Sequence, residues 1–225
     1  MTGKLCNDPT CEKTREGIRH SHDISNNVTQ KSEIFDNKIE KYVIKWEDFG
    51  DGQGLNAEIQ KSDGTKIAET KPEGSIRKKT VLFDFDGSVA LTAHKAMSMY
   101  AKYEIKDSDN NKIGNAGHYG LAWTVHMTWK NPKGKKILII KTIGKTILTG
   151  LKEGHVIGVR EINTMDDRNI AKFEVTRKKV ERSFWKSDYY YTCIIQIYDL
   201  DFDRKCIIGL VIAYLASFFD VRHSQ

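Results

Sequence analysis

The feature that most constrains the fold is one long apolar run near the C-terminus. It extends from Cys206 to Phe219, fourteen residues without a charged side chain. As an α-helix it would be about 21 Å long at 1.5 Å per residue, shorter than the roughly 30 Å hydrocarbon core of a bilayer. A helix that is apolar on every side belongs in a protein core. We therefore expect no transmembrane span, and a soluble fold built around this helix.

Gly209 lies inside this run. Glycine in a helix interior costs about 1 kcal/mol relative to alanine. We therefore expect a close packing contact at this position, as for a helix threaded through a tight space.

The body of the chain, residues 41–197, has the pattern of repeated strands and turns. Trp123, Val125, Met127 and Trp129 alternate with polar residues, and this period of two predicts a half-buried strand. The segment 172–176 alternates in the same way, and residues 189–198 are rich in aromatic and β-branched side chains. Short strands linked by turn signals predict an antiparallel sheet that closes or folds on itself.

Two segments of similar sequence support this interpretation. Residues 58–67 and 104–113 each resemble a hairpin, with an Asp-Gly or an Asn-Asn pair at the turn. The segment 88–100 is compatible with either a short helix or a strand. The mainly β body and the C-terminal helix together make up the predicted domain, residues 41–225, which follows an N-terminal extension, residues 1–40.

The segment Asp199–Asp220 resembles the C-terminal signature of the phospholipid scramblases. It has an aspartate-rich strand end, a basic residue, and an apolar helix closed by an acidic residue. The hairpin Tyr103–Ile113 resembles the strand–turn–strand units of the same superfamily, which includes the tubby proteins and the plant LURP-one-related proteins. The resemblance covers roughly residues 41–220.

The resemblance implies an antiparallel closed barrel of about twelve strands around a central hydrophobic C-terminal helix, with no catalytic centre. Tubby-like members bind phosphoinositide head groups through basic surface residues, and scramblases are associated with calcium-dependent lipid movement. The N-terminal region here lacks the proline-rich segment and palmitoylated cysteines of the scramblases. That departure argues against stable membrane anchoring and against scramblase activity itself.

Positive charge is concentrated in the middle of the chain. The net charge is +6, and residues 101–186 hold eighteen Lys and Arg against nine Asp and Glu. This excess indicates either a surface for phosphate-bearing partners, such as anionic lipid or nucleic acid, or a solubilising lysine-rich surface. If the basic turns converge on one end of a barrel, they can meet phosphates. The candidate lipid- or anion-binding residues are Arg77, Lys78, Lys79, Lys130, Lys133, Lys135, Lys136, Arg177, Lys178, Lys179 and Arg182.

Two groups of residues are candidate metal ligands. Cys6, Cys11, His20 and His22 offer the two thiolates and two imidazoles that tetrahedral zinc requires; the alternative is a tail without metal. The second group is Asp199, Asp201 and Asp203, whose carboxylates suit calcium. The glycine and glutamate of an EF-hand are missing there, and the alternative is that these aspartates cap the helix.

The sequence contains no convincing catalytic motif. Phe83–Gly87 matches the nucleophile loop of haloacid dehalogenase-type phosphatases, but those enzymes need an α/β domain that this strand-rich chain does not predict. His94, His118, His126 and His155 are widely separated, with no nucleophile pattern beside them.

The leading functional hypothesis is therefore a non-enzymatic module that recognises anionic phospholipid head groups at a membrane surface. The alternative is nucleic-acid or protein binding through a zinc-containing N-terminus and a basic surface. The N-terminus has no apolar run that would indicate a secretory signal, and four cysteines in two distant pairs do not suggest a disulfide framework. We expect an intracellular protein in the cytoplasm, at a membrane periphery or in the nucleus.

Overall fold

The structure is a computed structural model of the chain. It describes residues 32–48, 55–74, 79–96, 101–118, 126–143, 155–183 and 186–222. Twelve antiparallel strands form a closed barrel, as the resemblance implied and in agreement with the predicted sheet that closes or folds on itself. The strands are β1 (Lys41–Asp48), β2 (Ala57–Lys61), β3 (Lys66–Glu73), β4 (Lys79–Asp84), β5 (Val89–Lys95), β6 (Lys102–Asp107), β7 (Lys112–His118), β8 (Met127–Lys130), β9 (Lys136–Ile143), β10 (His155–Thr164), β11 (Asn169–Ser183) and β12 (Lys186–Ile197).

Each strand pairs with its neighbours in the sequence, and β1 closes the barrel by pairing with both β2 and β12. Closure leaves no open edge along the paired part of the sheet. The two similar segments are indeed hairpins, β2–β3 and β6–β7. Their turns place Gly64 and Asn110 at positive φ (88° and 63°), which is why an Asp-Gly and an Asn-Asn pair stand there. The ambiguous segment 88–100 contains a strand, β5.

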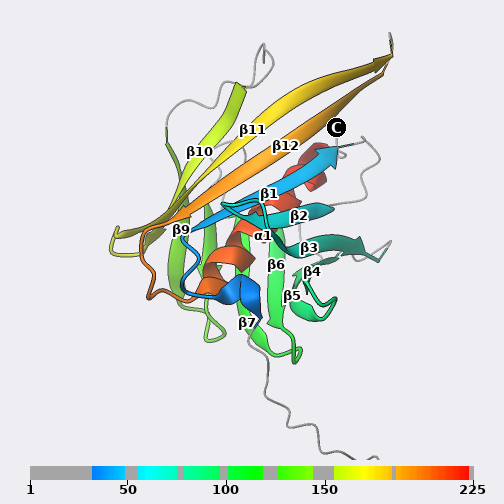
Figure 1. Cartoon of the computed structure of the whole chain (residues 1–225). Helices are drawn as coiled ribbons and strands as arrows, with labels where there is room; N and C mark the ends of the chain where they lie inside the picture. The colour runs from blue at the N-terminus through cyan, green and yellow to red at the C-terminus, as the bar shows by residue number, and fades with distance from the viewer. Residues whose placement is uncertain are drawn as a thin grey trace, which may run out of the picture. The chain divides into compact units, whose positions relative to one another are not determined.

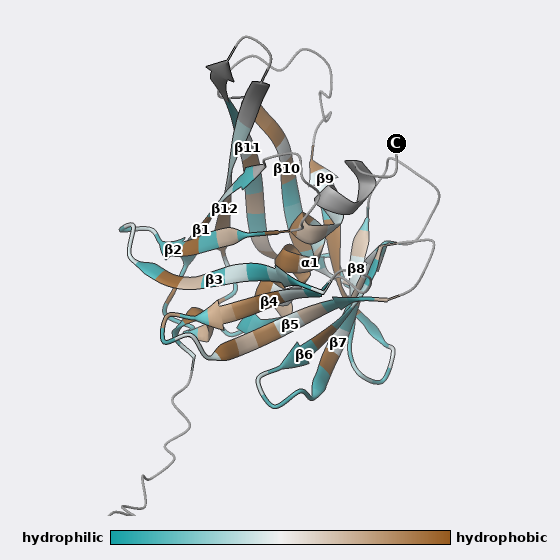
Figure 2. Ribbon diagram, turned by 90° about the vertical axis from the view of Figure 1, so that its right-hand side faces the viewer, coloured by the Kyte–Doolittle hydropathy of each residue, from teal (hydrophilic) through white to brown (hydrophobic). Residues whose placement is uncertain are grey.

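The C-terminal helix α1 (Arg204–Arg222) lies inside the ring of strands, as Figures 1 and 2 show. Its residues 206–217 are buried, and most of its apolar side chains are fully enclosed. They form one cluster with the inward side chains of the barrel. The prediction of a buried, all-round apolar helix is therefore confirmed. Among the described residues, no helix combines the length and the apolar character needed to cross a membrane.

Gly209 makes the close contact that the sequence predicted. A Cβ atom placed on Gly209 would lie 3.0 Å from Cζ3 of Trp129 and 3.3 Å from Cγ2 of Ile105. A Cβ on Gly114 would lie 2.4 Å from Cζ2 of the same indole. The helix thus approaches the barrel wall as closely as it does because glycine faces the tryptophan.

The compact unit that holds the barrel begins at Ser32, earlier than residue 41. A short 3-10 helix, Glu33–Phe35, places two buried side chains, Ile34 and Phe35, against the barrel core. The hydroxyl of Tyr42 on β1 donates a hydrogen bond to the carbonyl of Ile34 over 2.8 Å. Two apolar residues in a polar context were too weak a signal to place this segment in the domain.

The barrel has two distinct ends. At one, which we call the turn end, lie the tight turns 62–65, 85–88, 108–111, 131–135 and 165–168 and the β12–α1 connection 198–203. At the other, which we call the ribbon end, β11 and β12 continue beyond the neighbouring strands as a two-stranded ribbon (Figure 1). β10 begins to pair with β11 only at Arg177, and β1 stops pairing with β12 at Tyr189.

Candidate anion-binding surface

Two stacked aromatic side chains lie at the base of the ribbon. Trp46 on β1 lies opposite Tyr191 on β12, and the two rings stack with centroids 5.1 Å apart and an interplanar angle of 6°. Both side chains are buried, so neither offers an open face to a ligand. Their stacking joins β1 to β12 at the base of the ribbon.

Three of the predicted basic residues lie on β11 where the ribbon begins. Arg177, opposite Tyr191, is half-buried, and its guanidinium lies 4.5 Å from the ring centroid of Tyr189. This cation–π contact orients the guanidinium. Lys178 and Lys179 follow and are exposed. The backbone of Arg182 belongs to β11, but its side chain lies outside the described residues.

Neighbouring residues of β11 point to opposite faces of the sheet. Arg177 and Lys179 share the face that carries Tyr191 and Tyr189, whereas Lys178 lies opposite Tyr190 on the outer face. The basic residues of the ribbon are therefore divided between two surfaces. A partner that contacts the ribbon edge-on can reach both of them.

The described residue of the first predicted cluster, Lys79, is at the same end of the barrel. Lys79 is the first residue of β4, which starts at the ribbon end, and it forms an ion pair of 2.6 Å with Glu73. That pair offsets its charge. Arg77 and Lys78 lie outside the described residues.

The remaining predicted cluster is at the opposite end, so the expected convergence of all the basic turns does not occur. Lys130 ends β8, Lys133 and Lys135 lie in the β8–β9 turn, and Lys136 begins β9, all at the turn end. An odd number of barrel crossings separates this turn from the tip of the β11–β12 hairpin, which puts them at opposite ends.

The turn end is mainly acidic in its loops. Its turns and the β12–α1 connection contain three basic residues, Lys133, Lys135 and Arg168. They also contain eight aspartates: Asp63, Asp86, Asp109, Asp166, Asp167, Asp199, Asp201 and Asp203. Several of these carboxylates accept local hydrogen bonds; the backbone and side chain of Thr65, for example, hold the pKa of Asp63 below its usual value. Such bonds favour the charged form of the carboxylates.

The predicted calcium residues have local structural partners. Asp203 accepts a hydrogen bond of 2.9 Å from the backbone N–H of Lys205 at the start of α1, which is helix capping. Asp199 pairs with Arg168 over 3.0 Å, and Asp201 is exposed. Among the described residues, no group of three or more His, Cys, Asp or Glu side chains is arranged to hold a metal ion. The capping alternative thus accounts for Asp203.

The basic residue of the scramblase-like segment, Arg204, is almost completely buried. Its guanidinium donates to the carbonyl of Asp199 (3.1 Å) and to that of Asn37 (3.0 Å). Burial raises the pKa of the neighbouring Tyr42 to about 12, with Arg204 opposing that rise. Arg204 therefore joins the start of α1 to the segment before β1 and is not available to a ligand.

The other sequence motifs are accounted for by hairpin structure or lie outside the description. Phe83–Gly87 is the end of β4 and its turn, where the Asp84 carbonyl accepts a 2.9 Å hydrogen bond from Gly87 and the Asp86 carboxylate accepts one from Ser88. The predicted zinc ligands Cys6, Cys11, His20 and His22 lie outside the described residues, and zinc binding stays a prediction.

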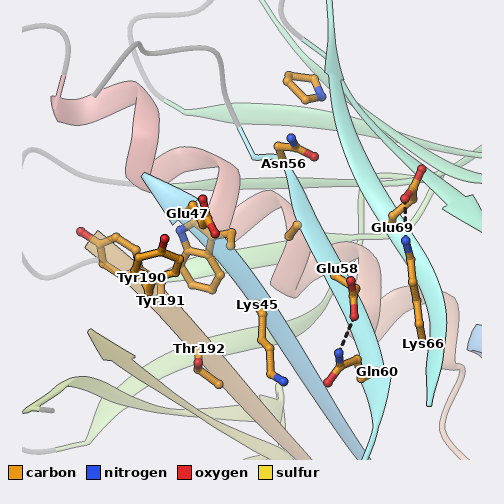
Figure 3. A pocket seen from close by; sticks show the side chains of 13 residues that line it. Lys45, Glu47, Asn56, Glu58, Gln60, Lys66, Glu69, Tyr190, Tyr191 and Thr192 are labelled. Atoms are coloured by element: carbon orange, nitrogen blue, oxygen red, sulfur yellow. Dashed lines mark hydrogen bonds and ion pairs between the residues drawn. The ribbon is translucent and has the colours of Figure 1, made fainter. Parts of the chain in front are cut away.

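The sequence did not reveal a groove on the outer face of β12, β1, β2 and β3, next to the base of the ribbon (Figure 3). It has a volume of about 740 Å³, and charged and aromatic side chains line it. The register places Lys45 between Thr192 and Glu58, with Glu69 on the next strand. Only the strand pairing brings these residues together; the signal in the sequence was the alternation of charge along each strand.

At one side of the groove, the charged side chains already pair with one another. Glu69 binds Lys66 over 2.8 Å and also pairs with Lys71. The hydrogen bond from Lys66, followed by that from Lys71, holds the pKa of Glu69 below its usual range. Glu58 accepts a hydrogen bond from the amide of Gln60.

Comparison with known proteins gives a likeness of shape to a solved structure. No protein-family model and no curated protein matches the chain. The X-ray structure of a protein from Arabidopsis thaliana is similar over 83% of this chain and 98% of that one, at 12% sequence identity and a TM-score of 0.45. The fold assignment therefore rests on the strands, their register and the buried helix: the chain forms a closed twelve-stranded antiparallel barrel with one C-terminal helix.

Proposed function

We propose that this protein is a non-enzymatic module that recognises anionic phospholipid head groups at a membrane surface, and that the ribbon end makes the contact. The observation that carries the proposal is the positively charged base of the ribbon, where Arg177, Lys178 and Lys179 follow one another on β11 at the point where the ribbon leaves the barrel. Arg177 is held in place over Tyr189. An oriented guanidinium loses little freedom when it binds phosphate.

The distribution of charge favours one end over the other. A flat bilayer cannot touch both ends of a barrel at once, and the lysines of the turn end stand among eight aspartates. Near an anionic membrane each basic residue contributes about 1 kcal/mol, whereas a nearby carboxylate offsets that gain. The ribbon end is thus the better membrane-facing surface.

The barrel architecture supports placing the chain in the scramblase and tubby-like superfamily. Twelve strands around an apolar C-terminal helix are what the resemblance of Asp199–Asp220 implied. Cys193 and Cys206 are both free thiols, which supports a reducing compartment and therefore a membrane that faces the inside of the cell.

Co-sedimentation with anionic vesicles tests the proposal. The variant Arg177→Gln/Lys178→Gln/Lys179→Gln should bind phosphatidylglycerol vesicles at least about tenfold more weakly than the unmodified protein. The matched control, Lys133→Gln/Lys135→Gln/Lys136→Gln, loses the same three charges at the turn end and should bind as the unmodified protein does. Binding should also decrease as the salt concentration rises.

Thermal unfolding of each variant separates lost binding from lost structure. Because Arg177 packs on Tyr189, the double variant Lys178→Gln/Lys179→Gln serves as a second test that leaves this contact in place. Equal binding by the two triple variants, or binding that does not depend on salt, would count against the ribbon as the lipid-binding surface.

A further inference from the structure

One cross-strand row on the outer face combines a cation, an aromatic ring and an anion. Lys178 on β11 lies opposite Tyr190 on β12, and Tyr190 lies opposite Glu47 on β1. All three point to the outer face, because the alternate residues Trp46 and Tyr191 point inward and are buried. Adjacent strands are about 4.8 Å apart, so the row spans roughly 10 Å between the backbones of Lys178 and Glu47.

The carboxylate of Glu47 stands apart from the ion pairs of the groove. Its side chain is exposed and forms no hydrogen bond or ion pair with any residue that the structure describes. Glu58 and Glu69, which line the same groove, already have partners. In Figure 3 Glu47 lies beside Tyr190 at the margin of the groove nearest the ribbon. A positive group placed there would meet both a carboxylate and a ring face.

We propose that Lys178, Tyr190 and Glu47 form a subsite for a head group that carries both a phosphate and an ammonium. This inference rests on the proposed function, and it adds the chemical class of the ligand. The ammonium of Lys178 meets the phosphate, while Glu47 and the ring of Tyr190 receive the amine through charge and cation–π contact. A phosphoethanolamine-like group carries its phosphate and its ammonium close together. The two charges can therefore contact different side chains of this row at the same time.

Two soluble probes separate this subsite from simple attraction of anions. O-phosphoethanolamine and glycerol 3-phosphate are both phosphate monoesters, but only the first carries an ammonium. A purely basic surface would prefer glycerol 3-phosphate because its net charge is more negative. The subsite should instead bind O-phosphoethanolamine roughly fivefold more tightly, as measured by calorimetric titration or by NMR shifts.

The variant Glu47→Gln should change the binding of the two probes differently. It removes one negative charge, so binding of glycerol 3-phosphate should stay the same or improve, whereas the preference for O-phosphoethanolamine should disappear. The matched control is Glu161→Gln, which makes the same change on β10 elsewhere on the barrel. It should keep the preference of the unmodified protein.

Equal or tighter binding of glycerol 3-phosphate by the unmodified protein would overturn the subsite, as would an unchanged preference in Glu47→Gln. Either result can occur while phosphatidylglycerol vesicles still bind the ribbon. Failure of this inference is therefore distinguishable from failure of the proposed function, which the vesicle assay alone decides.

Discussion

The indole of Trp129 is completely enclosed and lies close to two glycines that belong to different elements, Gly114 on β7 and Gly209 on α1. Neither glycine is required by a positive φ. Both are required by space, because the ring fills the volume that a side chain would need. The pair shows that helix and barrel wall are fitted to each other at the level of single atoms.

We predict that Gly114→Ala and Gly209→Ala differ clearly in their effect on stability. The Cβ of alanine at position 114 would overlap the ring at 2.4 Å, and the indole is completely buried. We expect a loss of about 2–3 kcal/mol in the free energy of unfolding for Gly114→Ala. At position 209 the nearest contact is 3.0 Å, and the gain in helix propensity offsets part of the cost.

Urea denaturation monitored by tryptophan fluorescence measures both values, and each variant acts as a control for the other because they touch the same ring. Equal losses for the two would mean that Trp129 can shift, and that the fit of the helix is looser than the contacts indicate.

Single residues also show where sequence reasoning reaches its limit. The close contact at Gly209 was predictable, because glycine weakens a helix and is favoured inside an apolar one where a neighbouring group approaches closely. The role of Arg204 was not: the guanidinium binds the carbonyl of Asn37, which precedes it by 167 residues. Backbone carbonyls are present at every residue, so no pattern in the sequence marks which one a buried arginine selects.

At the scale of elements, α1 is held within the barrel by apolar packing and by a few polar contacts. Nε2 of His118 on β7 lies 3.2 Å from the hydroxyl of Ser217 on α1, and the imidazole also contacts the ring of Tyr214. Nδ1 of His118 is buried without a hydrogen-bond partner among the described residues. Burial lowers the pKa of His118 to about 4, from an ordinary value of 6.5.

This contact predicts a dependence of stability on pH. Between pH 6.5 and about 4 the unfolded chain binds a proton at His118 and the folded chain does not, so acidification favours unfolding. The free energy of unfolding should fall through this range by on the order of 2 kcal/mol, allowing for partial exposure. Above pH 6.5 the contribution of His118 is constant.

The variant His118→Asn keeps a polar group near Ser217 but cannot titrate. Denaturation curves at about pH 7, 5.5 and 4.5, which bracket the titration, should show a smaller decrease in stability for this variant than for the unmodified protein. The same decrease in both proteins would place the acid sensitivity in other residues, such as the paired carboxylates.

The strands themselves were largely predictable, because alternation of apolar and polar residues follows directly from the geometry of a half-buried strand. The segments with weak patterns were the exceptions. Residues 88–100 fit two periodicities equally well, and pairing of β5 with β4 and β6 settles the strand. The segment 33–39 contributes only Ile34, Phe35 and Ile39 to the core, too few to show a period.

At the scale of the whole molecule, the described residues of the predicted basic clusters lie at opposite ends of the barrel. The sequence showed the basic clusters but not their positions, because the end at which a turn lies depends on how many strands precede it. An error of one strand moves a turn to the opposite end. Counting strands to within one is beyond what turn signals allow in a chain of twelve, so the separation of Lys133–Lys136 from Arg177–Lys179 emerges only from the closed topology.

This separation predicts the orientation of the protein on a vesicle. We expect a fluorophore at Lys179→Cys, on the ribbon, to be quenched by a quencher located in the lipid, and one at Lys133→Cys, at the turn end, to be unaffected. Both variants need Cys6→Ser and Cys11→Ser for selective labelling. Burial raises the pKa of Cys193 and Cys206, which keeps these two thiols unreactive.

Equal quenching at the two positions would show that the barrel lies on its side or has no fixed orientation. Stronger quenching at Lys133→Cys would reverse the proposed orientation altogether.

The position of α1 after all twelve strands has a consequence for how the protein is made. During synthesis, every strand leaves the ribosome before the segment that fills the space they enclose. β1 must also wait for β12 before the ring can close. Until translation reaches the last apolar residues, the inward faces of the sheet have nothing to pack against, and such exposed surfaces are prone to aggregate. We therefore expect the barrel to close only at the end of translation, when β12 and α1 become available.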